Sequence, residues 1–588
     1  MLPKPSAMRI LILPLLASAL LLGACGDNRS PSTAVVPLSV KGCGPTLMHD
    51  RDWYASDRSQ VLFAGLDQLN VPISIDGSLA STRRDSIQRY FDQGLLLAYG
   101  FNHAEAARSF WQATRLDSTC AMAWWGFAYV LGPNYNAGME PDNYERAHAA
   151  ITRALSLAER CTPKERDLIT AMAARYTAEP VKDRSPLDKA YTVAMRKVAA
   201  RYPDDPDIAT LFAEALMDEH PWDLWEKDGR EKPWTPEIIA TLERGMKRFP
   251  KHPGAHHLYI HAVEASRTPE RALPSAAFLT DAVPMSGHLV HMPSHIYIRT
   301  GRYHEGVLAN RRSVSLDSGY TASCHAQGVY PIAYFPHNIH FLSACAVMSG
   351  ERKQAWKSAL DLRDHLAEDL MHIPDFATLQ HYHAYPLQVA IKQNQWKELQ
   401  SEALPDRGLT YAQTMWHYAQ GMRLVRTGDA KGARTELAAL RAGIADSTVN
   451  QLTIWGINPV VDVLAIAEHL LTGEILAAEG DLAGGIAELE KAVAAEDGLQ
   501  YQEPPDWSFP VRHDLGAMLL KAGRAKEAEA VFAQDLIFWP ENGFALEGLH
   551  DALVAQGKQQ EASAVSKRVE AAWAHADRGS TGMQAQLR

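Results

Sequence analysis

The stretch that decides the fold runs from Leu515 to Pro540 and reads LGAMLLKAGRAKEAEAVFAQDLIFWP. It places large, small, turn, small, aromatic and stopping residues in order at Leu515, Gly516, Gly523, Ala528, Phe532 and Pro540. Small residues let two helices approach closely, larger residues fill the space between them, and a proline ends a helix. The stretch therefore predicts a helical hairpin that turns at Gly523.

The same pattern returns 34 residues further on, at Leu549, Gly557 and Ala562. That interval is the period of the tetratricopeptide repeat. Further turn glycines occur upstream at wider intervals, at Gly301, Gly350, Gly428 and Gly480. We therefore predict an all-α fold, a right-handed α-solenoid superhelix of tetratricopeptide-like hairpins, irregular in its front half and regular in its rear half.

Composition and repeat pattern divide the chain into predicted segments. These are a lipoprotein signal peptide (1–24), a flexible tether (25–45), an N-terminal extension (46–80), a divergent repeat half with the histidines (81–411), a regular repeat array (412–575) and a disordered tail (576–588).

The N-terminus predicts export. Arg9 precedes an apolar run from Ile10 to Leu22, which is shorter than the roughly 20 residues of a membrane span. Leu22-Gly23-Ala24-Cys25 resembles the lipobox of bacterial lipoproteins, and the resemblance implies lipidation of Cys25. The alternative is an ordinary signal peptide that ends near a cysteine. Gly26 follows the cysteine, and the resemblance therefore implies that the protein is attached to the periplasmic face of the outer membrane. The lipid anchor is the only expected contact with the membrane.

Composition argues against several functional classes. The formal net charge is −11, without the basic stripe of a nucleic-acid binder, so we expect no nucleic-acid partner. The chain has no Walker A loop, no GxSxG elbow, no HExxH helix and no EF-hand loop. No cysteine pair has CxxC spacing, so any disulfide is expected to be incidental.

The distribution of histidine, in contrast, indicates a functional site. The chain has 24 histidines, and ten of them fall in one short stretch, at His256, His257, His261, His288, His291, His295, His304, His325, His337 and His340. Such clustering is typical of metal binding.

Three groups make up the cluster. His257, His261 and Glu264 return to one face of a helix. The second group is His288, His291 and His295, where Pro293 predicts the start of a helix. The third is His337 and His340, which follow Pro336 and are predicted in the first turn of a helix. The helix dipole there favours the neutral imidazole that binds metals.

These groups are predicted to open the first helices of successive hairpins, so they can converge on one pocket. Imidazole with carboxylate suits a divalent transition metal, either Zn, Fe, Cu or Ni. Glu264 is the candidate carboxylate ligand or catalytic base. The alternatives are histidines that bond free backbone groups or lie satisfied in a core, and a Glu264 that pairs with Arg299 or Arg302.

Several strings resemble a group of bacterial tetratricopeptide-repeat proteins. The resemblance covers most of the chain from about Ser81. They are YGFNHAEAARSF, CAMAWWGFAYVLGPNYN, HHLYIHAVEAS, HMPSHIYIRTGRY and PHNIHFLSA. The resemblance implies a fold and a class but carries no activity.

Two functions remain open. The first is an envelope lipoprotein that acts as a scaffold and holds a protein or peptide partner in the solenoid groove, with or without a histidine-rich metal site. The second is a metal-dependent enzyme, a hydrolase or an oxidase, centred between His256 and His340.

Overall fold

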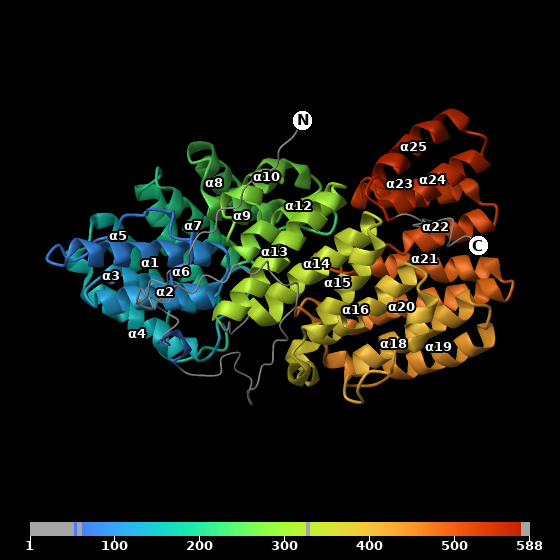
Figure 1. Cartoon of the computed structure of the whole chain (residues 1–588), viewed down its shortest axis with the longest axis horizontal. Helices are drawn as coiled ribbons and strands as arrows, with labels where there is room; N and C mark the ends of the chain where they lie inside the picture. Colours follow the sequence, from blue (N-terminus) through green and yellow to red (C-terminus); the bar gives the residue numbers. More distant parts are fainter. Residues whose placement is uncertain (1–51, 56–60, 325–329, 578–588) are drawn as a thin grey trace, which may run out of the picture. The chain divides into compact units, whose positions relative to one another are not determined.

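The computed structural model describes residues 52–55, 61–324 and 330–577. These residues form twenty-five α-helices, and two short strands, β1 (Thr453–Ile454) and β2 (Asn458–Pro459), pair antiparallel. Successive helices pack against one another as hairpins along the chain (Figure 1). The prediction of an all-α solenoid of helical hairpins is therefore confirmed. None of the described helices is both long enough and apolar enough to cross a membrane.

The helices up to the histidine region are α1 (Ser81–Tyr99), α2 (His103–Leu116), α3 (Ala121–Leu131), α4 (Asn143–Ser156), α5 (Pro163–Ala173), α6 (Ser185–Arg201), α7 (Pro206–Asp218), α8 (Thr235–Arg248), α9 (Pro253–Val263), α10 (Leu273–Ala282), α11 (Gly287–His291), α12 (Pro293–Arg299) and α13 (Tyr303–Cys324). Single 3-10 turns lie at Trp53–Ala55, Ala158–Arg160 and Pro269–Ala272.

The later helices are α14 (Phe335–Met348), α15 (Arg352–Asp364), α16 (Ala377–Lys392), α17 (Trp396–Ser401), α18 (Thr410–Arg426), α19 (Ala430–Ile444), α20 (Val460–Ala478), α21 (Leu482–Gly498), α22 (Arg512–Lys521), α23 (Ala525–Phe538), α24 (Gly543–Ala555) and α25 (Gln559–Ala572). A π-helical turn, Tyr330–Tyr334, precedes α14, and 3-10 turns lie at Glu368–His372, Pro374–Phe376 and Val449–Gln451.

The turn glycines confirm the hairpin pattern. All six that the sequence singled out adopt a positive φ, which only glycine tolerates without strain: Gly301, Gly350, Gly428, Gly480, Gly523 and Gly557. Each follows the first helix of a hairpin, where the left-handed residue ends that helix and begins the turn.

The small residues inside the hairpins make room for a buried aromatic ring. Phe532 on α23 is fully buried, and a Cβ added at Gly516 or Gly548 would lie 2.3 or 2.2 Å from its ring. Phe110 on α2 occupies the same kind of space, because a Cβ at Gly126 would lie 2.3 Å from its ring. The repeat pattern is thus a packing rule that places a glycine wherever the ring of a neighbouring helix presses on the backbone.

The hydrophobic core consists mainly of two large clusters of buried side chains. One runs from Trp53 to Tyr334 and the other from Ile298 to Val565, so they overlap in sequence around α12, α13 and α14. The histidine groups lie on helices at and just before this overlap. The predicted boundary between a divergent and a regular half, at residues 411 and 412, stays a prediction and falls inside α18.

Two local expectations near the histidines need refinement. α12 begins at Pro293 as predicted, but the approach to it is itself helical, because Met292 has αR backbone angles and α11 leads into it. α14 begins at Phe335, which places His340 in its second turn rather than its first. The signal peptide, Cys25 and the tether lie outside the described residues, as does nearly all of the predicted tail, from residue 578 on.

Candidate metal centre

α9 carries His257 and His261 one turn apart on a fully buried helix. A Cβ at Gly254, in its first turn, would lie 2.7 Å from the ring of Tyr99, so glycine lets α9 approach α1 closely. As a result the Nδ1–H of His257 donates to the carbonyl oxygen of Tyr99 at 2.6 Å. That bond fixes the ring and leaves the lone pair of His257 on Nε2, which faces His288.

α11 and α12 carry His288, His291 and His295, and all three are buried. A Cβ at Gly287 would lie 1.8 Å from a carboxylate oxygen of Asp317, so glycine again permits close packing, here of α11 on α13. The histidines therefore lie between α9 and α13, with α14 adding His337 from a third hairpin. His257 and His261 lie on α9, His295 on α12 and His337 on α14, the first helices of their hairpins, whereas His288 and His291 lie on the short helix α11 before α12.

The ligating atoms of these histidines gather into two groups. The first group consists of His257, His261 and His288, whose candidate ligand atoms lie within 4.8 Å of one another. Nε2 of His288 is 3.2 Å from Nε2 of His257. Among the described residues, Nε2 of His261 has no hydrogen-bond partner.

The second group consists of His291, His295 and His337, which meet the same 4.8 Å criterion. Nε2 of His291 lies 2.9 Å from Nε2 of His295. The Nδ1–H of His291 donates to Oδ1 of Asn310 at 2.6 Å. Nδ2 of Asn310 donates to the carbonyl of Gly306, so its oxygen is the atom that faces the histidine.

Glu264, the residue after α9, joins the two groups. Its Oε1 accepts from Nδ1 of His261 at 2.7 Å, and its Oε2 accepts from Nδ1 of His295 at 2.5 Å. Its carboxylate is therefore occupied by two histidines from different groups. The alternative expectation is a salt bridge between Glu264 and Arg299 or Arg302. Arg299 instead donates to the backbone carbonyl oxygen of Glu264.

Burial sets the charge state of the centre. Burial, and then the neighbouring histidines, hold the pKa well below the ordinary value for His257, His288, His291 and His337. Burial alone would raise the pKa of Glu264, but His295 and His261 lower it to about 2. For these four rings the lowered pKa favours the neutral form, and neutral rings with an ionised carboxylate nearby are what metal binding requires.

Two strained aromatic residues cover the first group. Phe101 and Trp222 have φ angles of 55° and 57°, in the left-handed region that bulky residues avoid. The Phe101 ring lies 4.5 Å from the ring of His257 and stacks at 5.8 Å on that of His261, which Trp222 also meets at 5.8 Å. Strain of this kind is concentrated at functional sites.

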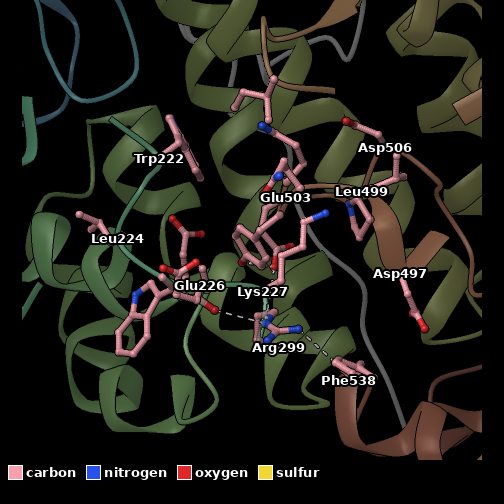
Figure 2. A pocket seen from close by; sticks show the side chains of 18 of the residues that line it. Trp222, Leu224, Glu226, Lys227, Arg299, Asp497, Leu499, Glu503, Asp506 and Phe538 are labelled. Atoms are coloured by element: carbon pink, nitrogen blue, oxygen red, sulfur yellow. Dashed lines mark hydrogen bonds and ion pairs between the residues drawn. The ribbon is translucent and has the colours of Figure 1, made fainter. Parts of the chain in front are cut away.

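A pocket of about 1000 Å³ opens onto one end of the centre. His261 and Glu264 line it, together with the stacked rings of Tyr135 and Trp222. Figure 2 shows Trp222, Leu224 and Glu226 on one side of this pocket and Asp497, Leu499 and Asp506 on the other. The pocket is therefore walled by segments from both halves of the chain.

The far wall is a loop between α21 and α22, residues 499–507, which the sequence analysis did not single out. Glu503 and Gln502 are 5% and 6% exposed and line the pocket. Oε2 of Glu503 and Nε2 of Gln502 have no hydrogen-bond partner among the described residues. Burial raises the pKa of Glu503 to about 7, although the nearby Arg299 lowers it. Buried polar atoms are nearly always paired, so these two atoms, which lie beneath the surface of the pocket wall, are exceptions.

Other predicted residues lie elsewhere. His340 contacts the rings of His381, Tyr382 and Tyr385, and so belongs to neither group. His256 turns away from its neighbour, because its Nδ1 meets Ser275 and its Nε2 meets the Pro250 carbonyl. His256 is thus a buried histidine with both ring nitrogens paired, whereas Nε2 of His340 has no hydrogen-bond partner among the described residues.

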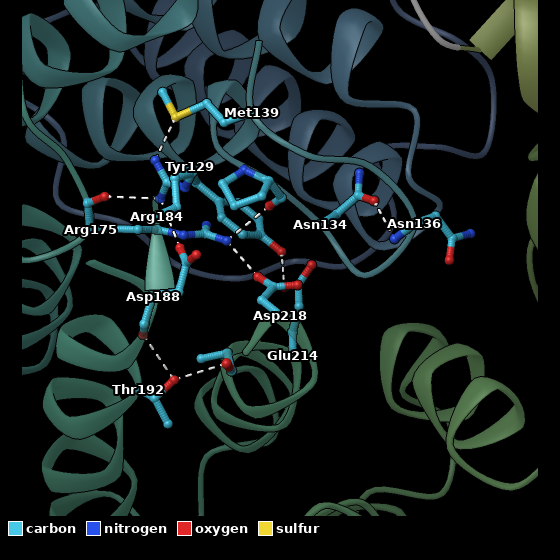
Figure 3. Close-up of polar contacts among 12 residues, drawn as sticks. Tyr129, Asn134, Asn136, Met139, Arg175, Arg184, Asp188, Thr192, Glu214 and Asp218 are labelled. Carbon is cyan, nitrogen blue, oxygen red and sulfur yellow. Dashed lines mark hydrogen bonds and ion pairs between the residues drawn. The ribbon is translucent and has the colours of Figure 1, made fainter. Parts of the chain in front are cut away.

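A second buried polar cluster lies in the front half (Figure 3). Nη2 of Arg175 donates to Asp218 at 2.5 Å and to the Pro133 carbonyl at 2.9 Å, and the Tyr129 hydroxyl donates to Glu214. These contacts tie α3, α5 and α7 together. Arg175 and Asp218 form an ion pair, whereas Nε and Nη1 of Arg175 and Oδ1 of Asp218 have no hydrogen-bond partner among the described residues.

No protein-family model matches the chain, and no curated protein sequence matches it. Solved structures show a distant likeness. The human IFIT1 dimer with m7Gppp-AAAA is 13% identical over 88% of this chain and 94% of that one, with a TM-score of 0.30. The APC/C hetero-tetramer Cut9–Hcn1 is 13% identical over 82% and 76% (TM-score 0.30), and yeast Tom70 is 10% identical over 83% and 92% (TM-score 0.29). Likenesses at this level do not extend to function.

Proposed function

We propose that this helical-repeat protein binds transition-metal ions at its histidine groups and uses them on a ligand held in the adjoining pocket. The observation that carries the proposal is that His261 and Glu264 belong to the histidine cluster and also line the pocket. A histidine cluster with a purely structural role does not need to open onto a pocket. A metal centre with an open coordination position does, because the ligand must reach the ion.

The donor set limits the metal. The groups offer imidazole nitrogens, with no thiolate among their closest atoms, which favours Zn²⁺, Cu²⁺, Ni²⁺ or Fe²⁺ over Mg²⁺ or Ca²⁺. When bound, such an ion supplies a Lewis acid or an activated water for hydrolysis, or redox chemistry in the case of copper or iron. The residues of this chain orient the rings, exclude water through Phe101 and Trp222, and hold the ligand against His261.

The pocket also favours a peptide as the ligand, which keeps the predicted protein or peptide partner. Gln502 and Glu503 are polar side chains on one wall of the pocket, and a peptide backbone presents carbonyl and N–H groups that polar side chains bind. Tyr135 and Trp222 offer an aromatic surface for a side chain beside His261. The rim carries charges of both signs, which suits a polypeptide better than a polyanion.

We further propose that this activity faces the periplasm. A lipid on Cys25 and the tether that follows it would hold the helical body at the membrane, with the pocket in the aqueous phase. The support is the sequence of the N-terminus alone.

Metal analysis of the full chain, purified in detergent without a histidine tag, tests the centre. We expect bound metal in the wild type and its loss in the His257→Ala/His261→Ala double variant. The matched control is His256→Ala, which removes the adjacent histidine that turns away, and it should keep the metal. Metal retained by a folded double variant, or lost equally from the control, would overturn the proposal.

A photo-crosslinking amino acid at Trp222 tests the ligand. We expect crosslinks to polypeptide that the Gln502→Ala/Glu503→Ala variant abolishes. The same group at Val554, which is 41% exposed and outside the pocket, should not form them. Equal crosslinking from both positions, or crosslinks to non-peptide material alone, would contradict a peptide ligand.

A further inference from the structure

We propose that the centre holds two metal ions, one in each histidine group. Glu264 orients one histidine ligand of each ion and binds neither ion itself. This inference rests on the proposed metal binding and adds to it the number of ions and the role of the carboxylate. It is carried by where the protons of the rings must lie, by the spacing of the ring nitrogens, and by the two hydrogen bonds that Glu264 accepts.

The proton positions follow from the partners of Nδ1. The carbonyl of Tyr99 can only accept a hydrogen bond, so His257 carries its proton on Nδ1. The carboxylate oxygens of Glu264 impose the same tautomer on His261 and His295. When such a ring is neutral, with its proton on Nδ1, Nε2 carries the lone pair that coordinates a metal.

His291 follows the same rule through Asn310. The Asn310 amide nitrogen is bonded to the Gly306 carbonyl, so its oxygen accepts from Nδ1 of His291. Nε2 of His291 therefore carries a lone pair and faces Nε2 of His295 at 2.9 Å. A proton on Nε2 of His295 can occupy the space between the two nitrogens, and a metal ion that binds both nitrogens would replace that proton.

The spacing of the close nitrogen pairs is that of hydrogen bonds and is also near the spacing of two ligands of one ion. Two nitrogens bound to one tetrahedral zinc at about 2.0–2.1 Å lie about 3.3 Å apart. The close pairs measure 3.2 Å in the first group and 2.9 Å in the second. Because a tetrahedral ion accepts four ligands, one ion cannot take six histidines, and the nitrogens already divide into two sets of three.

Glu264 links these sets. One oxygen fixes His261 of the first group and the other fixes His295 of the second, and the residue is 1% exposed. A carboxylate that holds a ligating imidazole is a common outer partner in metal sites. Here one carboxylate serves two ions and places a negative charge between two positive ones, which reduces their mutual repulsion.

The two sites differ in access. His261 of the first group lines the pocket, whereas no residue of the second group does so among the described residues. The ion of the first group is therefore the one that a ligand can reach. The ion of the second group is internal and acts on the first through Glu264.

The Glu264→Gln substitution tests this role because an amide has only one acceptor oxygen. The amide nitrogen would face Nδ1 of one histidine, which must then give up its Nδ1 proton and carry it on Nε2 instead. That ring can no longer bind a metal, while the ring facing the amide oxygen still can. We expect the full-length variant, stripped of metal and titrated with Zn²⁺, to bind one ion where the wild type binds two.

Two further arms keep the test decisive. His288→Ala and His337→Ala, one from each group, should each weaken one ion and leave the other, and Glu264→Asp should restore the second ion that Glu264→Gln loses. Glu237→Gln, an exposed carboxylate on α8 that pairs with Arg196, is the matched control and should bind two ions. Thermal unfolding of each variant shows whether the chain is folded.

The outcomes separate this inference from the proposed function. A folded wild type that binds no Zn²⁺ overturns both. A wild type that binds one ion, or a folded Glu264→Gln variant that binds two with unchanged affinity, overturns the two-ion inference and leaves metal binding intact.

Discussion

Nε2 of His291 lies 2.9 Å from Nε2 of His295, although each ring already donates its Nδ1 proton to another residue. Asn310 and Glu264 hold the two rings so that these nitrogens face each other. A metal ion that binds both nitrogens would take the place of the proton in the hydrogen bond between them. A site prepared in this way binds its ion with little rearrangement.

The role of Asn310 can be measured through metal affinity. Asn310→Leu keeps the volume but removes the acceptor that holds His291, so we expect Zn²⁺ affinity at the second group to fall about 10–100-fold. Competition with a chromophoric chelator measures the change. Asn310→Asp keeps an acceptor oxygen and should retain high affinity. Equal affinities in all three proteins would show that Asn310 does not position His291.

The pH dependence of stability should report Asp506. Burial raises the pKa of this carboxyl to about 7, and it accepts a hydrogen bond from Asn458 at 2.7 Å. The folded state therefore keeps a proton that the unfolded state releases near pH 4. Its contribution to the free energy of unfolding is fully present below that pH and is lost as pH rises to about 7, by at most ~1.4 kcal/mol per pH unit.

Asp506→Asn keeps the acceptor oxygen without the charge. We expect urea unfolding to show the variant gaining stability relative to the wild type as pH rises from 4 to 7. A difference between the two proteins that is constant over this range would contradict the raised pKa.

Packing around Phe532 predicts a cost for a single methyl group. Gly516→Ala would place a Cβ 2.3 Å from that ring, so we expect the free energy of unfolding to fall by about 1–3 kcal/mol. Gly498→Ala, at the end of α21 with no atom within 4 Å of the new Cβ, is the control and should leave the melting temperature unchanged or slightly raised. A Gly516→Ala protein as stable as this control would refute the packing account of the repeat.

The proposed anchor is tested by Cys25→Ser. We expect this variant to lose its lipid and to leave the membrane fraction, because the apolar run before Cys25 is too short to hold the chain there once the lipid is absent. Mass spectrometry of the wild type should find the lipid on that cysteine. Continued membrane association of the variant would argue against lipidation.

The sequence was informative where contacts are local. Gly523 and Gly557 reveal their positive φ by their 34-residue spacing, and the spacing of His257, His261 and Glu264 places them on one face of a helix. The sequence did not predict hydrogen bonds between residues that lie far apart in the chain. Nothing near Asn310 predicts its bond to His291, and the Tyr99 carbonyl that fixes His257 is a backbone atom 158 positions away.

The pocket wall shows the same limit. Glu503 and His261 lie on segments more than two hundred residues apart, and only the folded chain brings them to one pocket. One signal was available: Gly480 and Gly523 are 43 residues apart, nine more than the 34 of the regular repeat. The additional residues lie between α21 and α22, in the loop 499–507 that lines the pocket.

Crystals of the full chain grown with Zn²⁺, with diffraction recorded on both sides of the zinc absorption edge, test the central claim most directly. The account predicts two anomalous peaks, one among His257, His261 and His288 and one among His291, His295 and His337, each within about 2.0–2.1 Å of its nitrogen ligands. The absence of any peak beside these histidines, in crystals of folded protein, would contradict it.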